Sequence, residues 1–94
     1  MFIINGKIRN KTGKSASRYL RLNNKLPAIL YGKKKSNISI ELDHDSIFNM
    51  QLKSEFYKNN VYLVLDSIKY EVKVQSVQRH SFKPKLLHID FFYV

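Results

Sequence analysis

The stretch VYLVLDSIKYEVKVQSV, residues 61–77, decides the fold, because it has the pattern of a β-hairpin. An apolar run at 61–65 is followed by the turn residues Asp66 and Ser67, and alternating side chains then occupy residues 68–77. A strand that alternates in this way has one buried and one exposed face. The residues predicted to face inward on the second strand are Tyr70, Val72 and Val74, and those predicted to face outward are Lys69, Glu71, Lys73 and Gln75.

Similar patterns lie on both sides of this hairpin. Asp43 is placed to cap a helix, and the pair Asn23-Asn24 followed by Leu26-Pro27 is placed to end one. Six or so strands with two helices and no internal repeat predict an α+β fold, in which a mainly antiparallel sheet closes into a small barrel. We expect a single domain over residues 1–94. The predicted strands cover residues 2–9, 28–32, 38–42, 61–65, 68–77 and 86–94, and the predicted helices cover about 15–24 and 44–57.

The positive charge is concentrated in one segment. The chain has 94 residues with 17 Lys and Arg against 7 Asp and Glu, which gives a net charge of +10. Ten of the bases precede Glu41, the first acid, whereas the remainder has seven bases and seven acids. Segregation of this kind is typical of phosphate recognition, so RNA or DNA is the favoured partner. An anionic membrane surface and a general effect on solubility remain alternatives.

The first predicted helix displays part of this segment as one face. Four polar positions follow the spacing i, i+3, i+4 and i+7, and no acid lies among them to form helical ion pairs. Ala16 and Leu20 lie on another face and are predicted to pack on the sheet. A solvated helix face is the alternative, but uncompensated repulsion favours an anionic ligand. The four positions are Lys14, Ser17, Arg18 and Arg21.

Two function classes are disfavoured by what the sequence lacks. There is no cysteine, which excludes disulfides, thiolate nucleophiles and Cys-based zinc sites. The apolar run after Met1 is too short for a signal peptide, and no later run approaches a membrane span. We therefore expect a soluble intracellular protein with no membrane partner.

Histidines beside carboxylates raise the alternative of an enzyme. The segments 43–45 and 88–90 each combine His with Asp, as some metal sites and acid–base pairs do. No third ligand with matching spacing follows, and Asp43 is better explained as a helix cap. An RNA-cleaving enzyme would need at least a His pair or a His–Lys pair converging on one phosphate, and substitution of His80 and His88 with a turnover assay on RNA would distinguish it. We predict no catalytic residue, no metal ligand and no cofactor.

Five stretches, in one order along the chain, carry a family resemblance. They are Lys14-Ser15-Ala16-Ser17-Arg18, Pro27-Ala28-Ile29-Leu30-Tyr31-Gly32, Glu41-Leu42-Asp43-His44-Asp45, Val77-Gln78-Arg79-His80 and Leu87-His88-Ile89-Asp90-Phe91. Together they resemble the bacterial large-subunit ribosomal protein family that binds 5S rRNA. The resemblance is to the short single-domain form, without the C-terminal domain of the longer general-stress-protein Ctc homologues.

This resemblance implies a fold, a partner and a location. The fold is α+β, with a six-stranded, mainly antiparallel closed β-barrel and two or three short helices. The partner is 5S rRNA at its loop E region, within the large ribosomal subunit of the cytoplasm. The resemblance further implies a protein that is monomeric when free, and it leaves its neighbours in the ribosome open.

The resemblance also implies a set of RNA-binding residues. Lys14, Arg18 and Arg21 suit phosphates, whereas Gln75 and Gln78 suit base edges because an amide both donates and accepts. Gln75 as a plain outward strand residue, and Tyr31 as a core aromatic, remain alternatives. Two positions depart from the family pattern: Ser76 stands where Asp is common, and Ser81 where Pro is usual. The whole set is Arg9, Lys14, Ser17, Arg18, Arg21, Tyr31, Gln75, Ser76, Gln78, Arg79 and His88.

A second alternative is a general nucleic-acid-binding barrel for duplex DNA or single strands. Such a protein needs aromatic side chains on an exposed strand face, where bases can stack. The aromatic residues here gather instead at Phe82 and at 91–93, in an alternation that partly indicates core.

Overall fold

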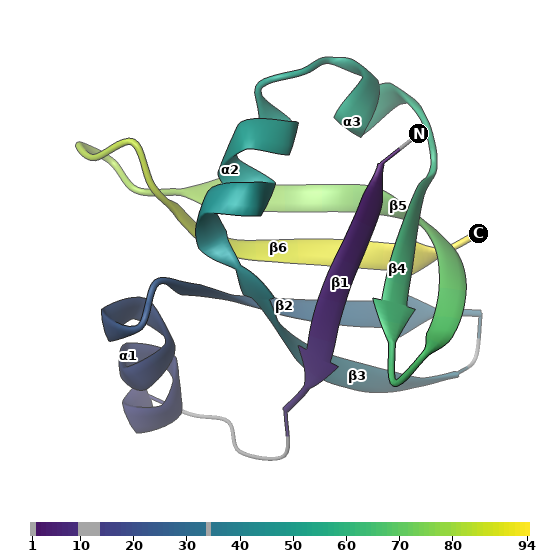
Figure 1. Cartoon of the computed structure of the whole chain (residues 1–94), viewed down its shortest axis with the longest axis horizontal. Helices are drawn as coiled ribbons and strands as arrows, with labels where there is room; N and C mark the ends of the chain where they lie inside the picture. Colours follow the sequence, from purple (N-terminus) through teal and green to yellow (C-terminus); the bar gives the residue numbers. More distant parts are fainter. Residues whose placement is uncertain (1, 10–13, 34) are drawn as a thin grey trace.

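A closed β-barrel with three helices around it forms the protein in the computed structural model (Figure 1). The structure describes residues 2–9, 14–33 and 35–94, and for residues 14–17 it describes the backbone alone. This confirms the α+β class and the small closed barrel. The strands are β1 (Ile3–Ile8), β2 (Lys25–Gly32), β3 (Lys35–Asp43), β4 (Val61–Leu65), β5 (Ile68–Arg79) and β6 (Leu86–Tyr93), and the helices are α1 (Lys14–Leu22), α2 (His44–Gln51) and α3 (Glu55–Lys58).

The hairpin of β4 and β5 has the predicted register. Val61 pairs with Val72 and Leu65 with Ile68, so the connection is the two-residue turn Asp66-Ser67. Both turn residues have positive φ, 49° and 66°, as a type I′ turn requires. This turn matches the twist of the flanking strands and fixes which side chains face the core. Val72 is accordingly buried, while Lys69, Glu71, Lys73 and Gln75 are exposed.

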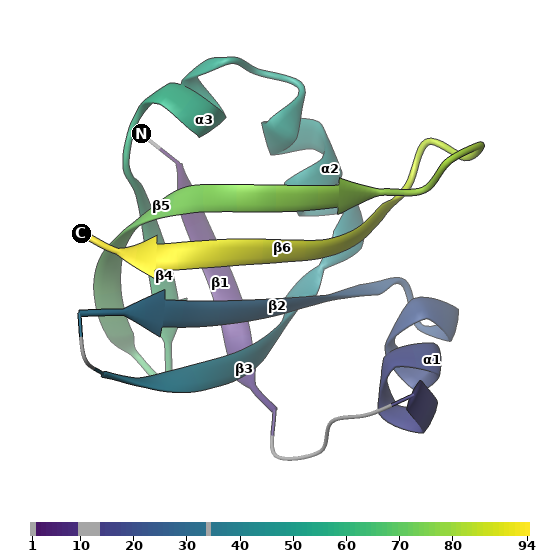
Figure 2. The ribbon, with the colours of Figure 1, turned by 180° about the vertical axis from the view of Figure 1, so that it is seen from behind.

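The barrel closes in the order β1-β3-β2-β6-β5-β4, and its pairings are mixed. Four neighbouring pairs are antiparallel, which confirms a mainly antiparallel barrel, whereas β1 with β4 and β2 with β6 are parallel. Figure 2 shows β2 beside β6 from behind, with both arrowheads at the same end. Parallel neighbours cannot be joined by a tight turn, and the path from β1 to β4 accordingly runs through α1, β2, β3, α2 and α3.

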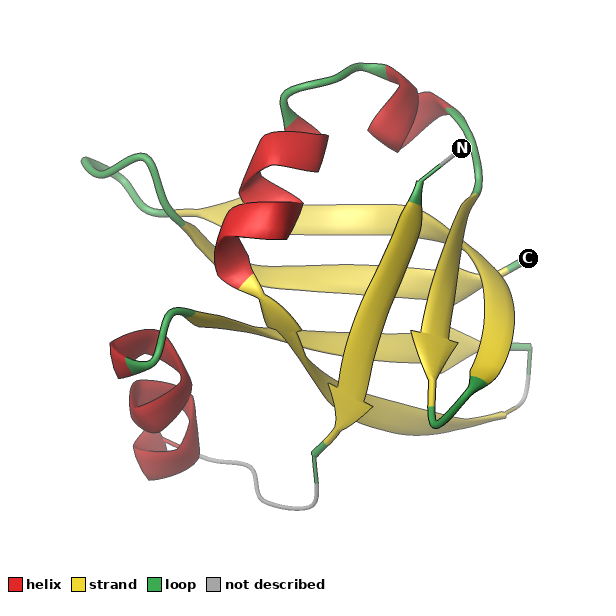
Figure 3. Ribbon diagram, in the orientation of Figure 1, coloured by secondary structure: helices red, strands yellow, loops and turns green. Residues whose placement is uncertain are grey.

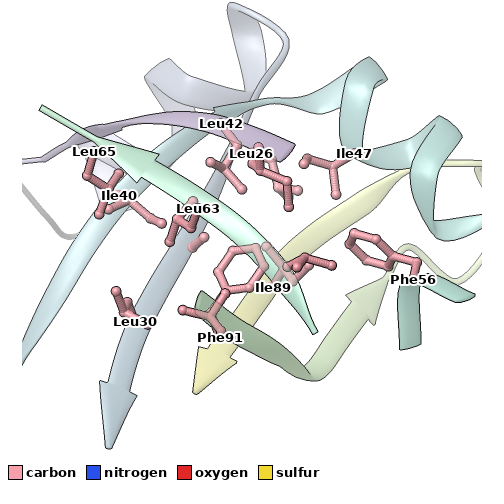
Figure 4. Close-up of a cluster of buried hydrophobic side chains, with 14 of the residues drawn as sticks. Leu26, Leu30, Ile40, Leu42, Ile47, Phe56, Leu63, Leu65, Ile89 and Phe91 are labelled. Carbon is pink, nitrogen blue, oxygen red and sulfur yellow. The ribbon is translucent and has the colours of Figure 1, made fainter. Parts of the chain in front are cut away.

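Side chains from all six strands and from α2 and α3 meet inside the barrel (Figure 4). Alternate residues of β6 enter it, so Ile89 and Phe91 are fully buried. Burial of an aliphatic or aromatic side chain of this size stabilises the fold by about 1.5–3 kcal/mol. Gly6 permits the close packing of β1, because a Cβ there would lie 2.8 Å from Cδ2 of Leu42.

The predicted helix over 44–57 is two helices, α2 and α3, separated by residues 52–54 (Figure 3). Ile47 on α2 and Phe56 on α3 are both fully buried. They are nine residues apart, which places them on opposite sides of a continuous α-helix at about 100° per residue. The break after Gln51 allows both side chains to point into the barrel. Asp43 caps α2 as predicted, since its carboxylate accepts from the backbone N–H of Ser46 at 3.1 Å.

Helix α1 ends where the sequence predicts. Asn24 has φ of 58°, the left-handed conformation that commonly follows a helix, and its N–H donates to the carbonyl of Arg21. The side chain of Asn23 donates to the carbonyl of Tyr19 at 2.8 Å. Leu20 is buried against the barrel, which confirms its predicted packing; the side chain of Ala16 lies outside the described part of the chain.

Candidate nucleic-acid interface

Helix α1 projects from one end of the barrel (Figures 1 and 2), and it carries two exposed arginines. Arg18 and Arg21 lie about one helical turn apart on one face of α1, whereas Leu20, between them in sequence, is buried on another face. In the part of the chain that the structure describes, neither arginine forms an ion pair. The side chains of Lys14 and Ser17 are not among those described, although both residues belong to α1. The helix thus offers at least two guanidinium groups to an anion.

The outer face of β5 has an irregularity that gathers polar side chains. The register between β5 and β6 shifts between Val74 and Ser76, which is the position of a β-bulge. In a regular strand, residues 75 and 78 would lie on opposite faces because their separation is odd. The bulge leaves Gln75, Ser76 and Gln78 all exposed. Three uncharged polar side chains therefore share one surface.

His88 and Asp90 lie beside this surface on β6. Gln78 pairs with His88 and Ser76 with Asp90, so the four side chains form two adjacent cross-strand pairs. Nδ1 of His88 lies 2.9 Å from Oδ1 of Asp90, and the two side chains are 33% and 28% exposed. When Nδ1 carries the proton and donates to Asp90, the second ring nitrogen, Nε2, is left free of its proton in the neutral ring. His88 and Asp90 therefore form a local pair on one face of β6.

Arg9 directly follows β1, which lies three strands from β6 in the closed order of the barrel. Its backbone N–H donates to the carbonyl of Ser39 at 2.7 Å. Ser39 pairs with Ile29, and Ile29 pairs with Asp90, so one row of outward residues runs from β1 to β6. Measured around the barrel wall, this row covers three strand spacings, about 14 Å. Among the described residues, its buried Nη2 has no hydrogen-bond partner.

Tyr31 lies on a neighbouring row of the outer face. It pairs with Phe92, whose ring meets the tyrosine ring edge-on at 5.5 Å between centroids. Nζ of Lys73 lies 5.4 Å from the centre of the Phe92 ring. Tyr31 is half-buried and is not a core residue, which excludes one of the two interpretations of its role. Phe92 likewise lies outside the core, whereas Phe91 and Tyr93 are buried as their alternation indicates.

Arg79 is directed away from these residues. The register shifts between Gln78 and Arg79, and Arg79 pairs with the buried Leu86. Its Nη2 donates to Oε1 of Gln51 at 2.8 Å and to the hydroxyl of Tyr57 at 2.6 Å. These contacts hold α2 and α3 against β5. The structure therefore separates Arg79 from the other predicted contacts on β5 and β6, although its Nε and Nη1 carry further N–H groups.

The histidine–carboxylate cluster at residues 43–45 has a structural role. His44 is buried, and its Nε2 accepts the backbone N–H of Leu86 at 2.9 Å, which ties α2 to the start of β6. Its Nδ1 lies 3.1 Å from Oδ1 of Asp45. Hydrogen bonds from His44 and then Asn24 lower the pKa of the Asp45 carboxyl from its ordinary value of 3.8. With Asp43 as the cap of α2, all three side chains of this cluster are used within the fold.

Across residues 2–9, 14–33 and 35–94, no three His, Cys, Asp or Glu side chains come together as a metal site requires. Within the same ranges, no helix is both long and apolar enough to cross a bilayer.

Two features of this surface were not predicted from the sequence. The bulge at Gln75 was missed, because an unbroken alternation through 68–77 places Gln75 outward but Ser76 inward. Asp90 was noted only as a neighbour of His88, and the row that links it to Arg9 depends on strands far apart in sequence. The spacing His88-Ile89-Asp90 was the one local signal for either feature.

Fold and surface together define a small basic β-barrel protein that presents a polar outer face and an arginine-bearing helix. Residues 4–91 match the model of the Ribosomal L25p family. The chain is 59% identical over 91 residues to the Large ribosomal subunit protein bL25 of Serratia proteamaculans (strain 568), and the match covers 97% of each chain. The protein of the same name from Klebsiella pneumoniae (strain 342) is 58% identical over 91 residues, again with 97% of each chain covered.

The chain belongs to the Ribosomal L25p family. This confirms the resemblance seen in the five sequence stretches. The members of this family are structural ribosomal proteins, so this chain is a ribosomal protein and not an enzyme. The histidines at positions 44, 80 and 88 therefore need explanations in folding or binding.

Proposed function

We propose that this protein is a component of the large ribosomal subunit that binds 5S rRNA at its loop E region. It would act in the cytoplasm, within the ribosome, as one domain over residues 1–94 that is monomeric when free. The observation that carries the proposal is the outer face of β5 and β6, where Gln75, Ser76 and Gln78 adjoin the His88–Asp90 pair. Family membership and the names of the two relatives support the ribosomal setting.

The polar face suits an RNA internal loop. The major groove of A-form RNA is too narrow for side chains, but non-Watson–Crick loops expose base edges that a rigid surface can contact. Gln75 and Gln78 each supply an amide donor and an acceptor, and Ser76 supplies a hydroxyl. His88, whose Nδ1 is engaged by Asp90, presents Nε2 as a further polar group. Because strands hold all four residues, the face needs little rearrangement to bind.

The arginines supply the attraction to phosphate. Arg18 and Arg21 are exposed on α1, Arg9 directly follows β1, and Tyr31 lies on β2, which pairs with β6. Guanidinium groups contact phosphates with several N–H donors at once. We assign Lys14 and Ser17 to the same helix surface on the basis of family resemblance. Arg79, held by Gln51 and Tyr57, would reach phosphate with Nε or Nη1 at the edge of the site.

A competition experiment tests this proposal against a general nucleic-acid-binding barrel. The labelled probe is a 5S rRNA fragment that contains loop E, and the competitors are unlabelled fragment, duplex DNA and single-stranded RNA. We expect the unlabelled 5S fragment to displace the probe at least about 10³-fold more efficiently than the other competitors, as for specific sites in general. Equal competition by all three would show that the surface binds by charge alone and would overturn the assignment.

A further inference from the structure

The loop between β5 and β6 presents an aromatic side chain that the fold does not use. Phe82 is 94% exposed, more than any other large apolar side chain in the described part of the chain. Exposed apolar residues are common singly, but a fully exposed phenylalanine contributes nothing to the core and favours association. Figures 1 and 2 show this loop extending beyond the same end of the barrel as α1.

The loop is held in shape by its own hydrogen bonds. Nδ1 of His80 accepts the backbone N–H groups of Phe82 and Lys83, each at 3.1 Å. The N–H of His80 donates to the carbonyl of Lys85 at 2.8 Å, and the N–H of Lys85 donates to the carbonyl of Lys83 at 2.7 Å. The exposure of Phe82 is therefore a consequence of an ordered turn around the imidazole. A side chain presented in this way loses little conformational entropy on binding.

The charge around Phe82 indicates which partner it fits. From Arg79 to Leu86, the stretch that includes the loop, the sequence contains three bases and no acid. Two of these bases, Lys83 and Lys85, follow Phe82 within the loop, and Lys83 is exposed. An apolar protein surface would not need this charge, whereas an unpaired nucleotide combines a flat apolar base with an anionic phosphate. Single-stranded nucleic acids are bound by such combinations of aromatic and basic side chains.

We propose that Phe82 stacks on an unpaired RNA base, with Lys83 and Lys85 at the adjoining phosphates. This contact is additional to the polar face of β5 and β6, and it rests on the proposed function only in that the partner is RNA. The base is one that RNA secondary structure leaves unstacked, so the tip selects single-stranded nucleotides over duplex. His80 positions the aromatic ring and does not contact the RNA itself.

A Phe82→Trp substitution gives a direct readout, because the chain contains no tryptophan of its own. The substituted protein is titrated with a short oligoadenylate and, separately, with a fully paired RNA hairpin, at a salt concentration that suppresses non-specific binding. Stacking on adenine should quench the fluorescence of the introduced indole with oligoadenylate and leave it unchanged with the hairpin. An unchanged signal with oligoadenylate would overturn the proposal.

Affinities of substituted proteins separate stacking from apolar contact. Loss of one stacked base corresponds to a decrease of about 5- to 150-fold, so Phe82→Ala and Phe82→Leu should both bind oligoadenylate more weakly by that factor. Leu52→Ala, which removes another exposed apolar side chain, serves as the control and should bind as the parent does. If Phe82→Leu retains the parental affinity for oligoadenylate, the side chain at position 82 does not stack on a base. An apolar protein surface is then the better partner for the loop between β5 and β6.

The same proteins distinguish this inference from the proposed function. Gln78→Ala should weaken binding to the loop E fragment and leave oligoadenylate binding unchanged. Suppose that Gln78→Ala weakens binding to the loop E fragment, but the Phe82 substitutions leave oligoadenylate binding unchanged. This result would overturn the stacking role of Phe82 and leave the 5S assignment standing. Suppose instead that the Phe82 substitutions weaken oligoadenylate binding, but the protein binds the loop E fragment no more tightly than an RNA duplex. This result would overturn the 5S assignment and leave the stacking role of Phe82 standing.

Discussion

Nδ1 of His88 and Oδ1 of Asp90 lie 2.9 Å apart on the outer face of β6, two residues from each other along the strand. Each nitrogen of the His88 ring can donate or accept a hydrogen bond. The Asp90 carboxylate only accepts, so it fixes the proton on Nδ1. It also places a negative charge in a surface proposed to bind RNA. A carboxylate without a partner there would repel phosphate. The hydrogen bond with His88 gives the Asp90 carboxylate a partner within the protein.

Asp90→Asn should therefore weaken binding to the loop E fragment while leaving binding to an unrelated RNA duplex equal or tighter. The first effect follows because an Asn amide can donate as well as accept, so it no longer fixes which ring nitrogen of His88 holds the proton, and the second follows from removal of one repulsive charge. In a double-mutant cycle with His88→Ala, the two substitutions should be non-additive by about 0.5–3 kcal/mol, as for residues in contact. Filter-binding titrations of the four proteins measure this coupling, and strictly additive losses would show that the pair does not act as a unit.

The arginines of α1 should control the salt dependence of binding. Each Arg or Lys held on a phosphate contributes about one unit to the slope of log affinity against log salt concentration. Arg18→Ala and Arg21→Ala should each bind 5S rRNA more weakly and with a shallower slope. Lys58→Ala, which removes an exposed base from α3, is the matched control and should keep the parental slope. Parental slopes for both arginine variants would mean that α1 is only solvated.

A glycine substitution in the turn between β4 and β5 should stabilise the folded protein. Asp66 and Ser67 adopt φ of 49° and 66°, and a non-glycine residue in the left-handed region costs about 1–2 kcal/mol. Ser67→Gly removes this cost, although the unfolded chain gains entropy, so a net gain of about 0.5–1 kcal/mol is expected. Urea unfolding measures it through a higher midpoint at unchanged m-value. A lower midpoint would indicate that the serine side chain stabilises the turn.

The sequence predicted the parts of the fold that depend on local patterns. The register of the 61–77 hairpin follows from a two-residue turn, and the cap at Asp43 follows from the side chain's reach to the backbone of Ser46. The parallel pairs β1–β4 and β2–β6 depend on how the whole barrel closes, which no local pattern encodes. The division of α2 from α3 could have been inferred, since Ile47 and Phe56 cannot share one face of a helix.

The residues of the candidate site likewise divide into those that local sequence patterns predict and those that depend on the tertiary structure. The exposed arginines of α1 and the outward Gln75 were predicted from periodicity, but Ser76 reached the same face only through a bulge. Arg79 looked equivalent to Gln78 in the sequence. Its side chain is directed to Gln51 and Tyr57, on helices that are distant in sequence, so this difference required the tertiary structure.

Asp45 should make stability depend on acid pH. Its pKa is lowered in the folded protein, mainly by the hydrogen bond from His44 and next by that from Asn24. A carboxyl group of this kind stabilises the fold fully above its unfolded value of about 4, and the contribution is lost as the pH falls through the lowered folded pKa. Asp45→Asn should therefore have a lower Tm than the parent near neutral pH, and the two Tm values should converge below about pH 4. A difference in Tm that stays constant across that range would exclude the carboxylate as its cause.

Gln78→Ala gives the clearest separation of base reading from charge. The substitution removes one donor and one acceptor from the outer face of β5 and changes no charge, so the electrostatic attraction to RNA is unaltered. If Gln78 contacts a base edge in loop E, affinity for the 5S fragment should fall by about 1–3 kcal/mol, while affinity for an unrelated RNA duplex should barely change. Asn49→Ala removes a similar exposed amide from α2 and is the matched control, for which neither affinity should change. Gel-shift titrations of the three proteins against both RNAs measure the contrast. Equal losses of affinity for both RNAs, or no loss for either, would mean that β5 and β6 only support the fold and that another part of the protein distinguishes 5S rRNA from other RNA.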